Sequence, residues 1–357
     1  MKVVVLYGPG DLRIEERNIP EPSDDKVLLK VKAITLCPTD IRKVLGHIDP
    51  AFFPLILGHE GAGVVEAVGP SVTRFKPGDK VWPQSIIACG VCRYCLSGKI
   101  NLCDDLTALG YGGGSFVKAK EFEKQGMHGV WAEYTLVKQN YLIKLPDDIP
   151  LSDASMIEPI SNVIKSVNTL DVSYKDVAVI GCGPMGLLHI MVASALGAGD
   201  IIAIDPIEDR LALSTKVGAT NTIDPSKSDP VQEVMNITGG NGVDVVIVAA
   251  GGAHQGALTE QGLKMVNKEG KVSIFAGTYP KKDMAIDPNL IHYKEIVLLG
   301  SFGYHGRHPY DAINLIRKNR GKVEMIRHPV FNSLEDILNV WQFYGKPGYY
   351  KIGIDLE

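Results

Sequence analysis

The sequence predicts a two-domain α/β protein, in which a mostly-β domain is joined to a doubly wound parallel sheet. Its 357 residues correspond to roughly two domains of ordinary size. Residues 1–150 contain short apolar runs separated by Pro and Gly, which is typical of strands joined by turns. Residues 151–299 instead alternate continuous apolar runs with helix-length segments, which indicates parallel strands and crossover helices.

In the first region, Met1–Tyr7 is expected to form a strand that ends at a Gly-Pro-Gly turn. Two Val-rich runs, Val27–Lys32 and Gly63–Val68, are further strands, and a Pro-Gly-Asp turn precedes another at Lys80–Trp82. Residues 107–130 are Gly-rich and mixed in charge, and they predict a long loop. Loops of that length inside a compact domain tend to be functional.

In the second region, the apolar run Asp176–Ile180 predicts a strand buried on both faces, and Leu187–Leu196 predicts the helix that follows it. Residues 300–357 are expected to add two helices and a last strand. The remaining predicted strands are Ile201–Ile204, Val243–Ala249, Val272–Phe275, Ile296–Leu299 and Tyr350–Ile354, and the remaining helices are Pro206–Val217, Gly256–Met265, Tyr310–Lys318 and Leu334–Tyr344.

Composition argues against several classes of protein. The net charge is −4 and 22% of residues are charged, so nothing indicates a nucleic-acid or anionic membrane partner. The first apolar run is too short for a secretory signal, and no run approaches the ~20 apolar residues of a membrane span. We therefore expect a cytoplasmic protein, whose thiols stay reduced.

Four of the six cysteines, Cys89, Cys92, Cys95 and Cys103, fall within fifteen positions. Thiolates at this spacing can close a tetrahedron around zinc with Zn–S bonds of about 2.3 Å. The intervening residues show no helical or strand period, so burial alone would not hold the segment. A disulfide cluster would need an oxidising compartment, and four unrelated core thiols would show a period. The pattern therefore predicts a structural zinc.

The segment Gly181–Gly186 has the pattern G-x-G-x-x-G and lies between a predicted strand and a predicted helix, which is the context that a dinucleotide site requires. Gly181 would make the tight turn, Gly183 would let a pyrophosphate approach the backbone, and Gly186 would let the helix pack on the strand. Asp205 ends the next strand at about the ~20-residue distance of a ribose-binding acid. Its charge would repel a 2′-phosphate, which favours NAD over NADP. The bland alternative is a Gly-rich turn without a cofactor.

A second, open zinc site is predicted from residues near strand ends. Cys37, His59 and a carboxylate from Glu60 or Glu158 would supply the three protein ligands of a catalytic zinc and leave one position for water or substrate. Taken singly, each has a bland alternative as a core cysteine, a satisfied buried histidine or a surface acid.

In their order and spacing, these motifs resemble the zinc-containing medium-chain dehydrogenase/reductase superfamily, in particular the sorbitol (polyol) and threonine dehydrogenases. The resemblance covers essentially the whole chain. It is carried by Cys37-x-Thr39-Asp40, Gly58-His59-Glu60-x-x-Gly63, the four cysteines, Ala132-Glu133-Tyr134, Glu158-Pro159, and Gly181–Gly186 with Asp205.

The resemblance implies a GroES-like catalytic domain, residues 1–150 and 300–357, and an NAD-binding Rossmann domain, residues 151–299. Cys37, His59 and Glu158 would bind the catalytic zinc, with Glu60 as a ligand or close partner, and Thr39 would take the alcohol proton. The chain would hold two zinc ions, one catalytic and one structural, act on a small-molecule alcohol, and form a homodimer or homotetramer. Cofactor contacts would come from Gly181, Gly183, Met185, Gly186, Asp205, Arg210, Ala276 and Phe302.

Three departures fall in the expected substrate region. Arg42 and Lys43 stand where the related enzymes usually have a proton-relay histidine, and His47 could take that role only if its loop folds back. The two cations would either bind an anionic substrate or form a solvated helix end. Gly303 replaces an arginine, and the Gly110–Gly129 loop is longer than usual. We expect oxidation of a polyol, sugar alcohol or cyclitol, with or without a phosphate. L-threonine 3-dehydrogenase and a non-catalytic dinucleotide-binding protein are the alternatives.

Overall fold

The computed structural model describes residues 1–50, 52–110, 120–121, 124–278, 280 and 282–356. It divides into two compact units, Met1–Glu158 with Tyr304–Glu357, and Pro159–Gly303. The first unit therefore extends past residue 150, so that Glu158 belongs with the strands that precede it. Of the predicted long loop, residues 111–119, 122 and 123 lie outside the described residues, and its first two residues form a strand, β8 (Thr107–Ala108).

The first unit is built on a mixed seven-stranded sheet whose central strand is β3 (Lys26–Thr35). β3 pairs antiparallel with β5 (Gly61–Val68) on one edge. On its other edge, β9 (Tyr134–Lys138) pairs with the first half of β3 and β18 (Gly353–Asp355) with its last residues. The C-terminal segment is thereby joined to the end of β3 that leads to Cys37. The sheet is completed by β6 (Lys80–Pro83), β10 (Leu142–Lys144) and β17 (Val330–Phe331).

A smaller antiparallel sheet in the same unit has the order β2–β1–β4. Its middle strand shares one apolar core with β3, because Val3 to Leu6 are buried in the same cluster as Leu29, Ile34 and Trp131. The strands of this sheet are β1 (Lys2–Gly8), β2 (Asp11–Glu16) and β4 (Leu55–Ile56), and a separate pair joins β7 (Ile86–Ile87) to β8 (Thr107–Ala108).

The second unit contains a six-stranded, all-parallel sheet of order β13–β12–β11–β14–β15–β16. From β11 the chain adds β12 and β13 on one side and then β14, β15 and β16 on the other, so the strand order reverses between β11 and β14. Sheets of this kind bind ligands at such a switch point, beyond the carboxyl ends of the strands. The predicted doubly wound sheet is confirmed. Its strands are β11 (Val177–Ile180), β12 (Ile201–Ile204), β13 (Asn221–Ile223), β14 (Val243–Val248), β15 (Val266–Ile274) and β16 (Val297–Gly300).

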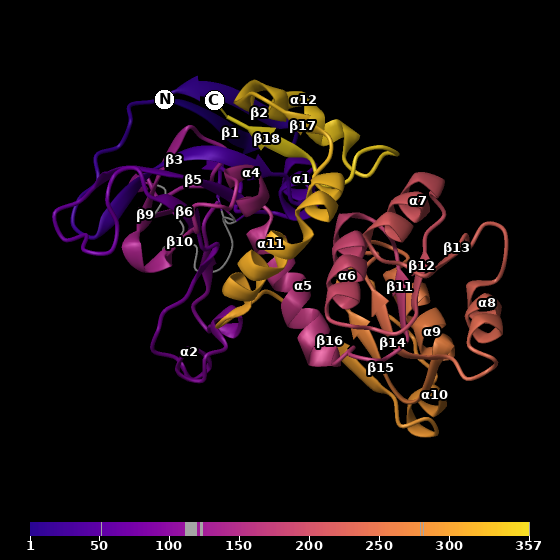
Figure 1. Cartoon of the computed structure of the whole chain (residues 1–357). Helices are drawn as coiled ribbons and strands as arrows, with labels where there is room; N and C mark the ends of the chain where they lie inside the picture. Colours follow the sequence, from indigo (N-terminus) through magenta and orange to yellow (C-terminus); the bar gives the residue numbers. More distant parts are fainter. Residues whose placement is uncertain (51, 111–119, 122–123, 279, 281, 357) are drawn as a thin grey trace. The chain divides into compact units, whose positions relative to one another are not determined.

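Helices cover this sheet in two groups. α6 packs on α7 beside β11 and β12, whereas α8 and α10 pack on α9 beside β14 and β15. Right-handed crossovers that run outward from one switch point place the two groups on opposite faces of the sheet. The helices are α5 (Ile157–Leu170), α6 (Pro184–Ala195), α7 (Glu208–Val217), α8 (Pro230–Ile237), α9 (Gln255–Met265) and α10 (Pro288–His292) (Figure 1).

Two predictions for the C-terminal region need correction. The helix expected at Tyr310–Lys318 is α11 (His308–Ile326), which passes through a non-helical Asn319 and continues beyond it. The helix expected at Leu334–Tyr344 is a series of short turns, namely η3 (Leu334–Asp336), α12 (Ile337–Val340) and η4 (Trp341–Phe343). The remaining short elements are α1 (Pro38–Val44), α2 (Arg93–Leu96), α4 (Leu151–Ala154), η1 (Ile100–Leu102) and η2 (Gln139–Tyr141).

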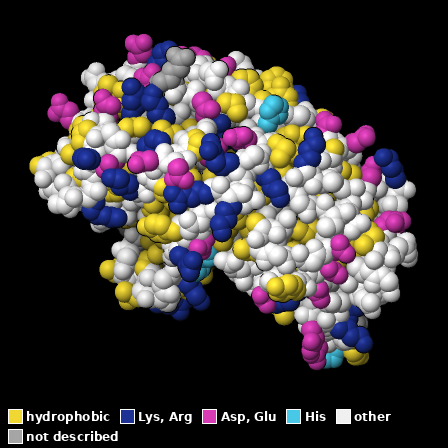
Figure 2. Space-filling model, viewed as in Figure 1, with side chains coloured by type: hydrophobic (Ala, Val, Ile, Leu, Met, Phe, Trp, Pro, Cys, Tyr) yellow, Lys and Arg dark blue, Asp and Glu magenta, His cyan; other side chains and the backbone are white. Residues whose placement is uncertain are grey.

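Two further observations concern the surface charge and the length of the helices. On the face drawn in Figure 2, basic and acidic side chains are interspersed. Within the described ranges, no helix combines the length and apolar character that crossing a membrane requires.

Candidate metal centres and dinucleotide site

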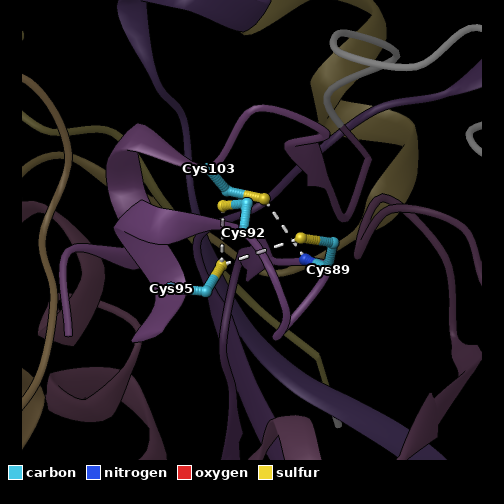
Figure 3. A group of neighbouring side chains, drawn as sticks. All are labelled: Cys89, Cys92, Cys95 and Cys103. Atoms are coloured by element: carbon cyan, nitrogen blue, oxygen red, sulfur yellow. Dashed lines mark hydrogen bonds between the residues drawn. The ribbon is translucent and has the colours of Figure 1, made fainter. Parts of the chain in front are cut away.

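The four clustered cysteines converge on one point in a lobe of the first unit (Figure 3). The sulfur of Cys95 lies 3.9 Å from that of Cys89 and 3.5 Å from that of Cys92. A tetrahedron of ~2.3 Å Zn–S bonds has edges of about 3.8 Å, whereas a disulfide needs about 2.05 Å. All four cysteines are free, so the donor set and its spacing fit a zinc ion.

The lobe has little else to hold it in place. α2, which begins directly after Cys92 and includes Cys95, contains no buried residue, and Val91 and Leu96 are each 77% exposed. The segment was expected to lack helix entirely, but it forms this single turn. Backbone N–H groups of Cys95 and Asp104 directed at Cys92 lower the pKa of that thiol to about 6. This favours the thiolate form that zinc binds.

The second cluster lies where β3 and β4 end. Cys37 follows β3 and caps α1, while His59 and Glu60 occupy the link between β4 and β5. One ligand atom from each of Cys37, His59 and Glu60 lies within 4.8 Å of the others. His59 and Glu60 are buried and Cys37 is half-buried. A thiolate, an imidazole and a carboxylate are a zinc-binding donor set, so these residues fit the predicted catalytic ion.

Glu158 is buried, but the three-residue cluster does not include it. Its charge helps to raise the pKa of Lys351, and burial together with the charge of Glu158 raises the pKa of Tyr304, so Glu158 lies near both side chains. Between the two candidate carboxylates, the structure therefore places Glu60 directly beside Cys37 and His59, and Glu158 in their buried surroundings.

Both oxygens of Glu60 accept hydrogen bonds from the protein. Lys351 Nζ donates to Oε1 at 2.6 Å, and Thr35 Oγ1 donates to Oε2 at 2.7 Å. Lys351 is fully buried; burial lowers the pKa of its ammonium, but Glu60 and Cys37 outweigh that effect and raise it. Lys351 thus stays charged and holds the Glu60 carboxylate in a fixed orientation.

His59 is oriented by a buried acid. Its Nδ1 lies 3.3 Å from Oδ2 of Asp40, which leaves Nε2 available for a metal. Burial opposes protonation of the imidazole, but Asp40 and Cys37 prevail and raise the pKa of His59 well above its usual value. A metal ion must therefore compete with a proton for this ring. A carboxylate behind a ligating histidine is a common outer-shell arrangement at zinc sites.

The other candidates of this region lie on or just after α1. Thr39 and Arg42 are half-buried, and His47 is exposed. Lys43 is only 1% exposed, so the interpretation as a solvated helix end is wrong for this residue.

The Gly-rich turn has the geometry that its pattern predicts. Gly181 has a φ of +92°, and a Cβ there would meet Ala250. A Cβ on Gly183 would meet open space, whereas one on Gly186 would come within 1.8 Å of the Gly181 carbonyl oxygen. The first glycine is thus required by the turn, the second leaves room for a ligand, and the third allows helix and strand to approach. Because Gly183 is the N-cap of α6, a phosphate placed there would meet the positive end of that helix.

Asp205 directly follows β12 and is 97% buried, as its exposed fraction is 3%. It accepts hydrogen bonds from the backbone N–H of Cys182 and of Ile207, at 2.8 and 2.9 Å. The Arg210 guanidinium lies 3.5 Å from the same carboxylate. Asp205 therefore fixes the Gly-rich turn to the end of β12, a role in addition to the predicted contact with ribose.

The remaining predicted cofactor residues lie at the carboxyl edge of the same sheet. Met185 is in the first turn of α6, Ala276 follows β15, and Phe302 follows β16 and is largely exposed. All parallel strands end on this edge, so these residues belong to the side on which a dinucleotide would bind. Gly303 is the last residue of this unit, and its φ of +63° suits a glycine.

Sequence reasoning missed three residues of the metal cluster. Asp40 was noted only as part of a motif, although its position three residues after Cys37 on a short helix was a signal. Thr35 and Lys351 gave no local signal, since 291 positions separate Lys351 from Glu60. Only the pairing of β18 with β3 brings that lysine to the site.

A Cys/His/carboxylate cluster in one unit and a dinucleotide-type turn in the other define the class of zinc-dependent alcohol dehydrogenases. Residues 23–147 match the alcohol dehydrogenase GroES-like domain family, and residues 184–318 match the zinc-binding dehydrogenase family. The chain belongs to the zinc-containing medium-chain dehydrogenase/reductase superfamily, and its expected two-domain fold is confirmed.

Among curated relatives, the chain is 36% identical to L-threonine 3-dehydrogenase of Pyrococcus horikoshii over 85% of this chain and 84% of that protein. It is 32% identical to sorbitol dehydrogenase of Bacillus subtilis, over 87% and 84%. Among solved structures, it is similar to galactitol-1-phosphate dehydrogenase from Escherichia coli, with a TM-score of 0.87, 26% identity, and 99% and 100% of the two chains covered. A structure described as a zinc-binding dehydrogenase from Sinorhizobium meliloti, bound to NADP, has a TM-score of 0.87, 29% identity, and coverage of 99% and 98%.

Proposed function

We propose that this enzyme oxidises a secondary alcohol of a polyol, sugar alcohol or cyclitol and transfers the hydride to NAD. The convergence of Cys37, His59 and Glu60 is the observation that carries the proposal, because it supplies an open zinc site in a chain that also has a dinucleotide turn. When bound, the zinc would supply a Lewis acid that lowers the alcohol's pKa, and the NAD would supply the hydride acceptor.

The chain's own residues divide the remaining work. Asp40 orients the His59 ring, and Lys351 with Thr35 orients the Glu60 carboxylate. Thr39, two residues after Cys37 on α1, supplies the hydroxyl that we assign to taking the alcohol proton. Because these contacts fix His59 and Glu60 in advance, the two ligands need little reorganisation during the reaction. Glu158, the carboxylate that the resemblance gives as the third ligand, is kept as the alternative to Glu60.

Three acidic side chains support NAD over NADP. Asp205 lies at the end of β12, and Glu208 and Asp209 occupy the first turn of α7, where a 2′-phosphate would meet like charges. The NADP in the Sinorhizobium meliloti protein makes this a point to measure. We expect Asp205→Ala to raise KM for both cofactors, because the Gly-rich turn loses its anchor, and to lower the NAD-to-NADP ratio of kcat/KM at least tenfold. An unchanged ratio would argue against a ribose contact.

The substrate class can be tested with a screen of polyols, inositols, amino alcohols and sugar phosphates, in which NADH formation is followed by absorbance. Zinc content should be measured on the same preparation, with about two ions per chain expected. A chain with one ion, bound only in the lobe, and with no turnover would instead be a non-catalytic dinucleotide-binding protein.

L-threonine oxidation is the second candidate, because curated relatives with that activity are 36% identical to this chain. Comparing kcat/KM for threonine and for sorbitol at saturating NAD separates the two. Among phosphorylated substrates, the half-buried Arg42 is the cation of this pair that can meet an anion, since Lys43 is enclosed. Arg42→Ala should reduce activity on a sugar-alcohol phosphate selectively, and an equal loss on neutral polyols would exclude anion capture.

We also propose a homo-oligomer. β16 is an edge strand whose Val297 is 49% exposed, and an apolar edge of this kind can pair with a second copy. Light scattering after size-exclusion chromatography would give the mass, and a monomer would refute the proposal.

A further inference from the structure

Lys43 is a buried cation beside the metal cluster. It lies on α1 three positions after Asp40, which places both side chains on one face of the helix. Its exposed fraction is 1%, and that of Asp40 is 0%. Enclosing an ammonium is costly unless nearby charges offset it. A lysine at such a position therefore needs an explanation beyond filling space.

The offsetting charges belong to the metal site. Burial lowers the pKa of Lys43 to about 8, while Asp40 and Cys37 act in the opposite direction. Neither carboxylate oxygen of Asp40 has a hydrogen-bond partner among the described residues, although His59 Nδ1 lies 3.3 Å from Oδ2. Asp40 is thus a buried carboxylate that faces the His59 ring and lies one helical turn before Lys43.

The charges of the site can be added up. With His59 neutral as a zinc ligand, the formal charges of Cys37, Asp40, Glu60 and Glu158 are four negative ones, and those of Lys43 and Lys351 are two positive ones, so the protein groups sum to −2. A divalent ion brings this to zero. Without Lys43 the loaded site would carry −1, which would disfavour formation of an anionic alkoxide among these buried groups.

We propose that Lys43 is a positioning residue that sets the charge of the catalytic metal site, keeping it neutral when the divalent ion is bound. It acts through Asp40 and Cys37 without being a ligand. Its positive charge loosens the hold on the metal and, in exchange, makes negative charge on the substrate oxygen more favourable. The inference rests on the proposed zinc-dependent alcohol oxidation.

The test compares Lys43→Met, which removes the charge at similar volume, with Lys43→Arg, which keeps it. Zinc affinity is measured on the whole chain by chelator competition, and the lobe ion serves as an internal control. We expect Lys43→Met to bind the catalytic-site zinc at least tenfold more tightly, with unchanged lobe affinity, and to lose at least tenfold in kcat with KM within twofold. Lys43→Arg should behave as the unmodified chain in both respects.

A merely structural lysine would give the opposite sign, because disordered ligands bind zinc more weakly. Unchanged or weaker zinc binding in a folded Lys43→Met, or an Arg variant that resembles Met, would overturn the proposal. Lys43→Gln is the second neutral variant; if neither neutral variant folds while Lys43→Arg does, the charge serves the fold, and the proposal fails. An unmodified chain that binds zinc only in the lobe would refute the proposed function instead.

Discussion

The two metal clusters of this chain are built in contrasting ways. The four cysteines of the lobe come from fifteen consecutive positions and have few packed neighbours, since α2 buries none of its residues. Cys37, His59 and Glu60 come from two separate links of the chain and are held by Asp40, Thr35 and Lys351. A metal thus organises the lobe, whereas at the second cluster the fold organises the ligands. A fixed, prebuilt site with one open position suits catalysis, and a closed four-thiolate site suits a staple.

The largest effect is expected from Cys37→Ser. Loss of a thiolate ligand removes the Lewis acid, whose contribution of several kcal/mol corresponds to a decrease in kcat of about 10³-fold or more. Because the fold pre-forms this site, circular dichroism and the urea midpoint should change little. Retained turnover in the purified variant would show that Cys37 is not a ligand of a catalytic zinc, and the two clusters would then not differ in the way described.

Lys351→Met should produce the largest loss of stability. It leaves Glu60 as a buried carboxylate without its counter-ion, which costs about 3–5 kcal/mol in the free energy of unfolding. Urea unfolding of Lys351→Arg, which keeps the charge, gives the first control. Lys175→Met gives the second, because its exposed partner Asp171 makes that pair worth about 1 kcal/mol or less. Equal losses in Lys351→Met and Lys175→Met would show that Glu60 is not held as described.

Two histidines away from the metal clusters should make stability depend on pH. Burial lowers the pKa of His128 and of His189 to about 4, so both stay neutral in the native state. In the unfolded chain the same histidines take up protons near pH 6.5. Their contribution to the free energy of unfolding is therefore fully present above pH 6.5 and is lost as pH falls toward 4. From pH 7 to 5 each contributes a loss of about 2 kcal/mol.

Urea unfolding at pH 7 and pH 5 measures this dependence. His189→Gln should reduce the difference between the two pH values, whereas the same change at the exposed His292 should not. A pH dependence that is the same in both variants would contradict the assignment to His189.

The smallest effect on the whole molecule is expected from Cys95→Ser. Zinc content should fall by one ion per chain, and limited proteolysis should give a new cut within residues 89–103, because no buried side chain of α2 holds the lobe closed. The urea midpoint of the rest of the chain should move little. A large decrease in the urea midpoint of the whole chain would contradict this prediction, because it would show that the rest of the fold depends on the lobe.

The difference between the clusters also explains how far sequence reasoning could reach. The lobe was predictable because its ligands are close along the chain, and the Gly181–Gly186 turn because each glycine has a local task. The predicted helix Leu187–Leu196 begins three residues later than α6, which starts at Pro184, next to the Gly-rich turn. The break at Asn319 and the division of residues 334–343 into short turns depend on local backbone geometry that apolar spacing does not encode.

The sequence by itself determined the class of protein, because strand and helix periods, cysteine spacing and the Gly-rich turn are properties of neighbouring residues. It also provided the candidate ligands Cys37, His59 and Glu60. Only the tertiary structure decided which carboxylate lies beside them, that Lys351 and Thr35 hold it, and that Lys43 is enclosed rather than solvated. The physical reason is that burial and charge pairing arise between segments far apart in the chain, and strand pairing such as that of β18 with β3 brings those segments together.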